Sequence, residues 1–218
     1  MGKIHSGILS GVSGTVGPVV GAIVRGVATL RSRPKKSTKP AKESQIQQRT
    51  KFGLATKFIK SIKRMVDIGF QAYNKTMSPA NAAVQELLAN AITGVSPNYT
   101  IDFPKVVFSK GGLYDALTLR VMPPLPDLEL RFTWNPAELP SEEALQYAND
   151  RIAFVLYDEV TGRFITLLGA AARSAGTYQL SVPFVFEGAT LHVWAFFVNP
   201  EGTDVSNSQY LGTVTPIM

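Results

Sequence analysis

The chain has 218 residues and no cysteine, with two histidines, 22 Lys and Arg and 16 Asp and Glu. This length suffices for one domain with an appendage and for a substantial hydrophobic core. The absence of cysteine excludes disulfide scaffolds, thiolate metal sites and cysteine nucleophiles. The two histidines, His5 and His192, are too few and too far apart in sequence to predict a zinc centre.

Charge is distributed unevenly along the chain. Residues 1–96 carry 15 Lys and Arg against three Asp and Glu, a net charge of +12. Residues 97–218 carry seven Lys and Arg against 13 Asp and Glu, a net charge of −6. This asymmetry predicts two differently built regions, of which the basic one suits an acidic partner such as a nucleic acid.

Residues 4–24 carry no charged side chain, so they are candidates for a signal peptide or a membrane span. Glycine, serine and threonine take too many of these positions for a span of about 20 strongly apolar residues. A single lysine, Lys3, precedes the stretch, and no clear cleavage site follows it. We therefore expect no membrane contact and synthesis in the cytoplasm, with the final location open between a virion-like particle and the cell surface after non-classical export.

Residues 1–42 are predicted to form a glycine-rich, extended arm of short strands and turns. Valine and isoleucine favour strands here, and the repeated glycines permit turns. A helix with a glycine stripe is the alternative, but repeated glycine and Pro18 make it costly. The residues that we expect to contact a neighbouring subunit are Gly7, Gly11, Gly14, Gly17, Gly21 and Val24. A basic, proline-containing run follows, with Arg31, Arg33, Lys35, Lys36 and Lys39.

Residues 43–96 are predicted to be helical. Apolar residues recur three or four apart between Ser44 and Tyr73, which indicates one buried stripe. Ser78 and Pro79 announce a second helix, as an N-cap followed by proline at the first helical position. The apolar faces of this helix pair need a partner, either in the same chain or in a neighbouring subunit.

Residues 97–218 are predicted to be a β domain. Leucine and aromatic residues alternate with polar ones from residue 128 to 134. Two apolar runs, 152–157 and 163–168, flank a hairpin loop, and the run 189–198 is apolar on both faces, as expected of a central strand. The spacing favours an immunoglobulin-like or fibronectin-like antiparallel sandwich with Trp134 in its core. The predicted fold class is therefore α+β.

Several motifs resemble an uncharacterised bacterial family. They are the start Met1-Gly2-Lys3-Ile4 with the glycine-rich run Gly7 to Gly21, the segments Arg31-Ser32-Arg33-Pro34 and Gln47 to Phe52, and the segments Ala172 to Thr177 and Val205 to Gly212. The resemblance implies the same order of glycine-rich start, basic arm, helical middle and β carboxyl half. It implies no activity, so no functional residues are transferred. The Arg-Pro and Gln-Arg-x-Lys-Phe segment is also similar to short proteins of phage-like gene sets, which favours an assembly component.

No set of residues predicts catalysis. His192 lies within a predicted strand beside Trp194, and no Gly-x-Ser-x-Gly elbow occurs. The glycines at 11, 14 and 17 lack the lysine of a nucleotide loop. We expect a protein that is not an enzyme, with no catalytic, cofactor-binding or metal-binding residues and no small-molecule substrate.

Three functions remain as hypotheses. The leading one is a structural protein whose arm packs on a neighbouring subunit, which gives a homo-oligomer or polymer such as a filament or a virion-like particle. The alternative is a nucleic-acid-binding module that uses the basic segment 31–64, although this segment has no interleaved aromatic residues for base stacking. A third is a carbohydrate-binding sandwich that uses loops near Glu142 or Asp204.

Overall fold

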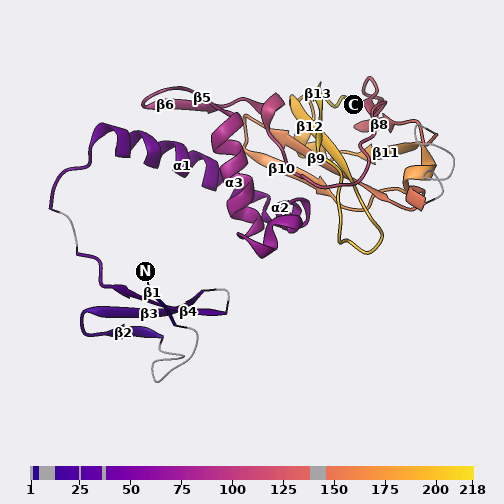
Figure 1. Ribbon diagram of the computed structural model, residues 1–218. Helices are drawn as coiled ribbons and strands as arrows, with labels where there is room; N and C mark the ends of the chain where they lie inside the picture. Colours follow the sequence, from indigo (N-terminus) through magenta and orange to yellow (C-terminus); the bar gives the residue numbers. More distant parts are fainter. Residues whose placement is uncertain (1, 5–12, 25, 36–37, 138–145) are drawn as a thin grey trace. The chain divides into compact units, whose positions relative to one another are not determined.

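The computed structural model describes residues 2–4, 13–24, 26–35, 38–137 and 146–218 (Figure 1). The chain divides into two compact units: residues 1–42, called here the N-terminal unit, and residues 43–218, the main unit. The boundary lies where the basic run ends and the helical pattern begins. Each unit has its own sheets, and all three α-helices of the described residues belong to the main unit.

The N-terminal unit contains a four-stranded antiparallel sheet in the order β1-β4-β3-β2. Its strands are β1 (Gly2–Ile4), β2 (Gly14–Val16), β3 (Val19–Val24) and β4 (Val27–Ser32). The predicted short strands and turns are present. The strands pair with one another in a sheet, so these residues do not form a single extended arm. The reason is local, since Gly17 (φ +55°) and Gly26 (φ +77°) take the left-handed conformation in the tight turns on either side of β3.

The main unit begins with helices α1 (Glu43–Ser61), α2 (Lys63–Gly69) and α3 (Pro79–Asn90). The predicted start of the last helix is confirmed, because Ser78 Oγ accepts a hydrogen bond from Asn81 N–H at 3.3 Å. The prediction of a helix pair is wrong in one respect: the first helix breaks at Ile62, whose N–H bonds to the Ile59 carbonyl three residues back. The break lets residues on both sides of it enter one core.

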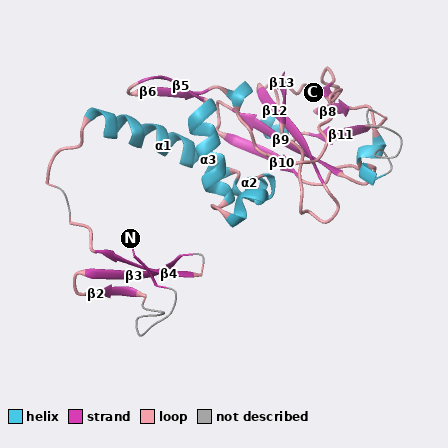
Figure 2. Ribbon diagram, viewed as in Figure 1, coloured by secondary structure: helices cyan, strands magenta, loops and turns pink. Residues whose placement is uncertain are grey.

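Two antiparallel sheets form the carboxyl half of the main unit (Figure 2). The larger has the order β10-β9-β12-β13, with β9 (Arg151–Asp158), β10 (Arg163–Leu167), β12 (Leu191–Val198) and β13 (Gln209–Val214). The smaller has the order β11-β8-β7, with β7 (Arg120–Val121), β8 (Glu129–Thr133) and β11 (Thr177–Ser181). A separate hairpin, β5 (Ile92–Val95) and β6 (Asn98–Ile101), follows α3. The predicted central strand at 189–198 and the hairpin after β9 are confirmed.

Strands β9 and β12 divide their side chains between two cores. On one face, Ala153, Val155, Trp194 and Phe196 pack with Phe58, Ile59 and Val66 of the helices. On the other face, Ile152, Phe154, Val193 and Phe197 pack with Leu130, Phe132 and Trp134 of the smaller sheet and its end. Successive side chains of a strand point to opposite faces of the sheet, and here each face is covered by its own layer. Alternate residues of β9 and β12 therefore enter different cores.

The partner of the helical apolar faces is therefore the sheet of the same chain. The fold is α+β, with three α-helices and several small antiparallel sheets among the described residues. The immunoglobulin-like sandwich remains a prediction. That prediction did not include the helices that cover one face of the larger sheet. None of the helices in the described ranges is both long and apolar enough to cross a membrane.

Candidate interaction surfaces

The sheet of the N-terminal unit has two chemically different faces. Residues opposite one another across paired strands share a face, so the register assigns Val16, Val19, Ile23, Ala28 and Leu30 to one side. The other side carries Thr15, Val20, Ala22, Val24, Val27, Thr29 and Arg31. On the first side, none of the residues from β2, β3 and β4 is charged, so we call this side the uncharged face. These residues are Gly14, Val16, Val19, Gly21, Ile23, Ala28, Leu30 and Ser32.

Neither face of this sheet is covered by a core within the described part of the unit. Only Gly21 and Thr29 are buried there, and Thr29 Oγ1 donates a hydrogen bond to the Ala22 carbonyl at 2.9 Å. Val16 is 65% exposed, and Ile23 and Val24 are each 55% exposed. A sheet needs a second layer to bury its apolar face. Both faces therefore carry exposed apolar side chains that no other described residue of the unit covers.

The predicted contact residues of the arm lie in different parts of this sheet. Gly14 pairs with Gly21 across β2 and β3, Gly17 lies in the turn between these strands, and Val24 ends β3 on the face opposite Ile23. A side chain at Gly14 or Gly17 would meet no heavy atom within 4 Å. Gly7 and Gly11 lie outside the described residues. The glycines therefore build turns and a small-residue strip and leave the apolar contact area to valine and isoleucine.

The predicted basic residues line the end of this sheet and the linker after it. Arg31 is exposed in β4 opposite Val20, and Arg33 donates its backbone N–H to the Pro18 carbonyl at 2.8 Å. Lys35 and Lys39 are exposed, and Lys36 lies outside the described residues. The basic segment 31–64 belongs to both units, residues 31–42 to the N-terminal unit and residues 43–64 to the main unit.

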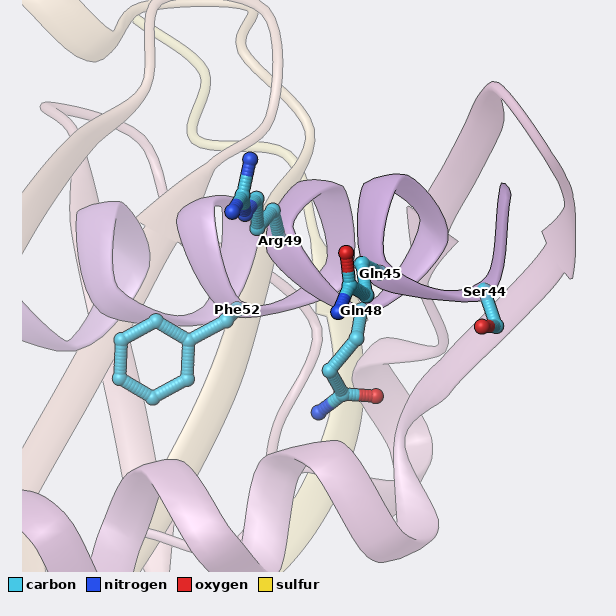
Figure 3. A pocket seen from close by; sticks show the side chains of 5 residues that line it. All are labelled: Ser44, Gln45, Gln48, Arg49 and Phe52. Atoms are coloured by element: carbon cyan, nitrogen blue, oxygen red, sulfur yellow. The ribbon is translucent and has the colours of Figure 1, made fainter. Parts of the chain in front are cut away.

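A first apolar hollow of the main unit lies beside α1 (Figure 3). Phe52 is 51% exposed and, with Ser44, Gln45, Gln48 and Arg49, lines a shallow space of about 470 Å³. Phe52 also borders a second space of about 450 Å³ with Val84 and Leu88 of α3. Because the polar part of this lining includes Arg49, we call the two spaces together the basic groove.

A second apolar surface lies where the C-terminal segment meets the smaller sheet. Leu128 N–H bonds to the Ile217 carbonyl at 2.9 Å, and Gly188 N–H bonds to the Pro216 carbonyl at 3.0 Å. These bonds bring two segments with exposed apolar side chains together, and we call these side chains the terminal patch: Phe184, Val185, Ile217 and Met218. Asp127 and Glu187 are exposed next to Leu128 and Gly188, the residues that donate these bonds. No prediction from the sequence covered residues 183–188, because Phe184 and Val185 stand in a short segment between two predicted strands and carry no periodic pattern.

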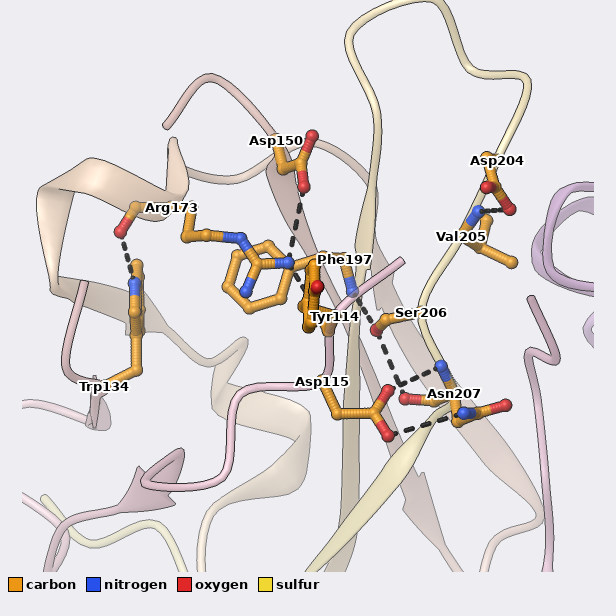
Figure 4. Close-up of polar contacts among 10 residues, drawn as sticks. All are labelled: Tyr114, Asp115, Trp134, Asp150, Arg173, Phe197, Asp204, Val205, Ser206 and Asn207. Atoms are coloured by element: carbon orange, nitrogen blue, oxygen red, sulfur yellow. Dashed lines mark hydrogen bonds and ion pairs between the residues drawn. The ribbon is translucent and has the colours of Figure 1, made fainter. Parts of the chain in front are cut away.

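A buried arginine organises the end of the main unit (Figure 4). Arg173 Nη2 contacts Asp150 Oδ2 at 3.3 Å and donates to the Tyr114 carbonyl at 2.7 Å. Its guanidinium lies 3.8 Å from the centre of the Phe197 ring, and its carbonyl accepts the indole N–H of Trp134 at 2.6 Å. Burial raises the pKa of Asp150 above its ordinary value, although the Arg173 charge opposes the rise. This arrangement joins five segments of the main unit.

The segment 102–119 is held by residues 204–208. Ser109 Oγ donates to the Ser206 carbonyl at 2.7 Å, and Asn207 N–H donates to Asp115 at 2.8 Å. Asp204 accepts the N–H of Val205 at 2.8 Å and that of Gly112 at 3.3 Å. The carboxyl-terminal motifs of the family resemblance therefore anchor the fold. Asp204 therefore takes part in this anchoring, and Glu142 lies outside the described residues.

His192 contacts a tyrosine and lies near a glutamate. Its Nδ1 contacts the Tyr210 hydroxyl at 2.9 Å, and its Nε2 lies 3.9 Å from Glu159. Burial lowers the pKa of His192, against the opposing effect of Glu159. No serine or cysteine joins this pair among the interactions of the described residues. The same part of the chain holds no group of three or more His, Cys, Asp or Glu placed to bind a metal ion.

A family model described as a family of unknown function (DUF6266) matches residues 11–212. The match spans all of the resemblance motifs except the first residues of the glycine-rich start, and it confirms the resemblance to an uncharacterised family. No curated protein and no solved structure matches the chain.

Proposed function

We propose that this chain, which belongs to the DUF6266 family, is a non-enzymatic structural protein and one subunit of a larger assembly. In this proposal, the N-terminal unit packs on a neighbouring subunit, and the product is a homo-oligomer or a polymer such as a filament or a virion-like particle. The two sheets of the main unit then form the β-sandwich body of the subunit, with the core around Phe132, Phe154 and Phe197 between them.

The observation that carries this proposal is the sheet of the N-terminal unit, which has strands and turns but no core among its described residues. Small units without disulfides or metals need apolar burial to offset the entropy of ordering the chain. A surface that supplies the missing layer therefore stabilises this sheet as it binds. An assembly partner is such a surface, and it converts exposed valine and isoleucine into buried contact area.

The helices of the main unit do not add support for assembly. The apolar helical faces are already packed on β9 and β12 of the same chain, so they need no neighbouring subunit. The charge asymmetry remains as support. Residues 1–42 carry eight Lys and Arg and no Asp or Glu, whereas residues 97–218 are acidic. Unlike surfaces on one chain favour contacts between copies.

The mass of the purified full-length chain in solution, at low and at high salt, tests the proposal. We expect a large species at low salt that becomes smaller at high salt, because screening weakens contacts between exposed charges. The double variant Val16→Lys, Ile23→Lys should reduce the mass, because both side chains are exposed on the unpartnered sheet. Val160→Lys is the matched control, since Val160 is 93% exposed at a hairpin turn of the main unit. A monomer under both salt conditions would contradict the proposal.

Nucleic-acid binding is the second candidate, favoured by the exposed Arg31, Arg33 and Lys35 in a unit without acidic residues. Binding of this kind depends steeply on salt, because each neutralised phosphate releases counterions. Neutralising these three residues should lower the affinity for DNA or RNA and flatten its salt dependence. If the full-length chain shows no salt-dependent binding to either nucleic acid, this candidate is excluded.

A further inference from the structure

We infer that the uncharged face of the N-terminal sheet docks on the terminal patch of a second copy of this chain, so that copies join head to tail. This inference rests on the proposed function and specifies its two surfaces. Both expose apolar side chains: Val16 and Ile23 on the sheet, and Phe184 (68% exposed), Val185 and Met218 (70% exposed) on the patch. Contact between them removes both sets from water.

Charge selects the terminal patch over the basic groove. The N-terminal unit carries eight Lys and Arg and no Asp or Glu. Asp127 and Glu187 are exposed next to the residues that bond to the C-terminal segment, whereas Arg49 is among the residues that line the groove. Docking a strongly basic unit is attractive at the first surface and repulsive at the second. Face-to-face packing of two N-terminal sheets would likewise bring two strongly basic units together.

The attachment point of the linker favours a second copy as the occupant. Residues 33–42 connect β4 to α1, and they span at most about 35 Å when fully extended. Helix α1 has 19 residues and is therefore about 28 Å long. Within the main unit, the terminal patch lies beyond the far end of α1, near the C-terminus (Figure 1). To bring its sheet to its own patch, a chain would have to stretch nearly the whole linker along α1. A neighbouring copy can present its patch without this constraint.

This placement predicts the symmetry of the assembly. The docking sheet is tethered at one end of the main unit, and the patch that receives it lies at the other end. The two surfaces differ, so the contact is heterologous, and repeated heterologous contacts give a ring or an open chain of subunits. A closed dimer with one shared contact patch is not expected from these surfaces.

The absence of cysteine makes a direct test possible in the full-length chain. The double variant Ile23→Cys, Val185→Cys is treated with a short bifunctional maleimide and analysed on a denaturing gel. We expect a ladder of dimers, trimers and longer species. The variant Val24→Cys, Val185→Cys is the matched control, because Val24 has the same 55% exposure as Ile23 but lies on the opposite face. The variant Ile23→Cys, Val160→Cys controls for an exposed residue away from the patch. The single variants give the background.

A ladder from the Ile23 and Val185 pair that both control pairs lack supports the inference. A crosslink within one chain without a ladder, equal ladders from all pairs, or a stronger ladder from Ile23→Cys with Phe52→Cys overturns it. If the chain assembles but the Ile23 and Val185 pair gives no ladder, the inference fails while the proposed function stands. If the chain is monomeric at both salt concentrations, both fail.

A charge reversal provides a second test that needs no crosslinker. Glu187→Lys should raise the dissociation constant of the assembly at least about tenfold at low salt, because it adds repulsion against the basic unit. Glu187 is preferred to Asp127, which has a positive φ of 63° where lysine is unfavourable. Glu201→Lys, in a different exposed loop, is the control. Equal effects of the two reversals would mean that the patch is not the receiving surface.

Discussion

The chain contains two four-stranded antiparallel sheets with opposite surroundings. In the sheet β10-β9-β12-β13, strand β12 is buried at seven of its eight positions, with helices on one face and a second sheet on the other. In the sheet β1-β4-β3-β2, strand β3 is buried only at Gly21. In both sheets, neighbouring strands pair antiparallel. The difference shows that pairing alone defines a sheet but does not stabilise it, since stability depends on the layers that cover its faces.

The largest effect is expected from removing the charge that pairs with Asp150. The side chains of Arg173 and Asp150 are 5% and 2% exposed, so Arg173→Ala leaves an unpaired buried carboxylate. We expect the free energy of unfolding of the main unit to fall by about 3–5 kcal/mol in urea titrations. The loss should shrink at low pH, because burial already raises the pKa of Asp150 and its protonation removes the unpaired charge.

Arg131→Ala provides the matched control for this prediction. Arg131 is exposed on β8, and its removal should change the free energy of unfolding by less than about 0.5 kcal/mol. Equal losses from the two arginine variants would mean that the buried ion pair does not stabilise the main unit.

Two glycines of the helical layer should respond to alanine with opposite signs. A Cβ on Gly69 would lie 2.0 Å from the Phe108 carbonyl oxygen, so Gly69→Ala forces the backbone apart and should cost about 1–3 kcal/mol. A Cβ on Gly53 in α1 would meet no heavy atom within 4 Å, so Gly53→Ala should raise helix stability by about 0.5–1 kcal/mol. Thermal unfolding of both variants, followed by circular dichroism, measures the difference. A stabilising Gly69→Ala would contradict the close approach of residue 108.

The pH dependence of the main unit should include a contribution from His192. Burial lowers its pKa below the ordinary 6.5, so the unfolded chain binds a proton at a higher pH than the folded chain. The free energy of unfolding should therefore fall as the pH drops below 6.5. His192→Gln should flatten this part of the melting-temperature profile. Glu159→Gln should steepen it, because the Glu159 charge favours the protonated ring. A profile that His192→Gln leaves unchanged would assign the dependence to other groups.

The smallest effect is expected in the N-terminal sheet. Ile23→Thr removes an apolar side chain that is already 55% exposed, so in the dissociated chain it should change the unfolding of the main unit by less than about 0.5 kcal/mol. Amide hydrogen exchange in the same state should show faster exchange in β3 than in β12. Equal protection of the two strands would mean that the N-terminal sheet has a covering layer without assembly.

The strands with the clearest patterns could be predicted from the sequence. The run 189–198 is apolar on both faces and became the central strand β12, and the alternation around Leu130 and Phe132 became β8. Both follow from local periodicity. The layers on the two sides of β12 could not be predicted in this way, since the helices and the smaller sheet contact it through residues distant in sequence.

The structural features that the sequence did not predict have either no local sequence pattern or a pattern that favours a different structure. The break at Ile62 involves neither glycine nor proline, and the apolar periodicity continues across it. Phe184 and Val185 lie in a short 3₁₀ helix that exposes them, although their composition favours a buried strand. The role of Arg173 depends on Asp150, Tyr114 and Phe197, which only the folded chain brings together.

The division of β12 between two cores has a consequence for synthesis on the ribosome. Helices α1, α2 and α3 emerge before the sheet that covers them, and Trp194 and Phe196 of this sheet are translated about a hundred residues after the end of α3. During this interval the apolar faces of the nascent helices have no native partner. Contacts of such long sequence separation also slow folding, because loops must close before burial offsets their entropy. The growing chain is therefore expected to depend on chaperones until β12 has left the exit tunnel.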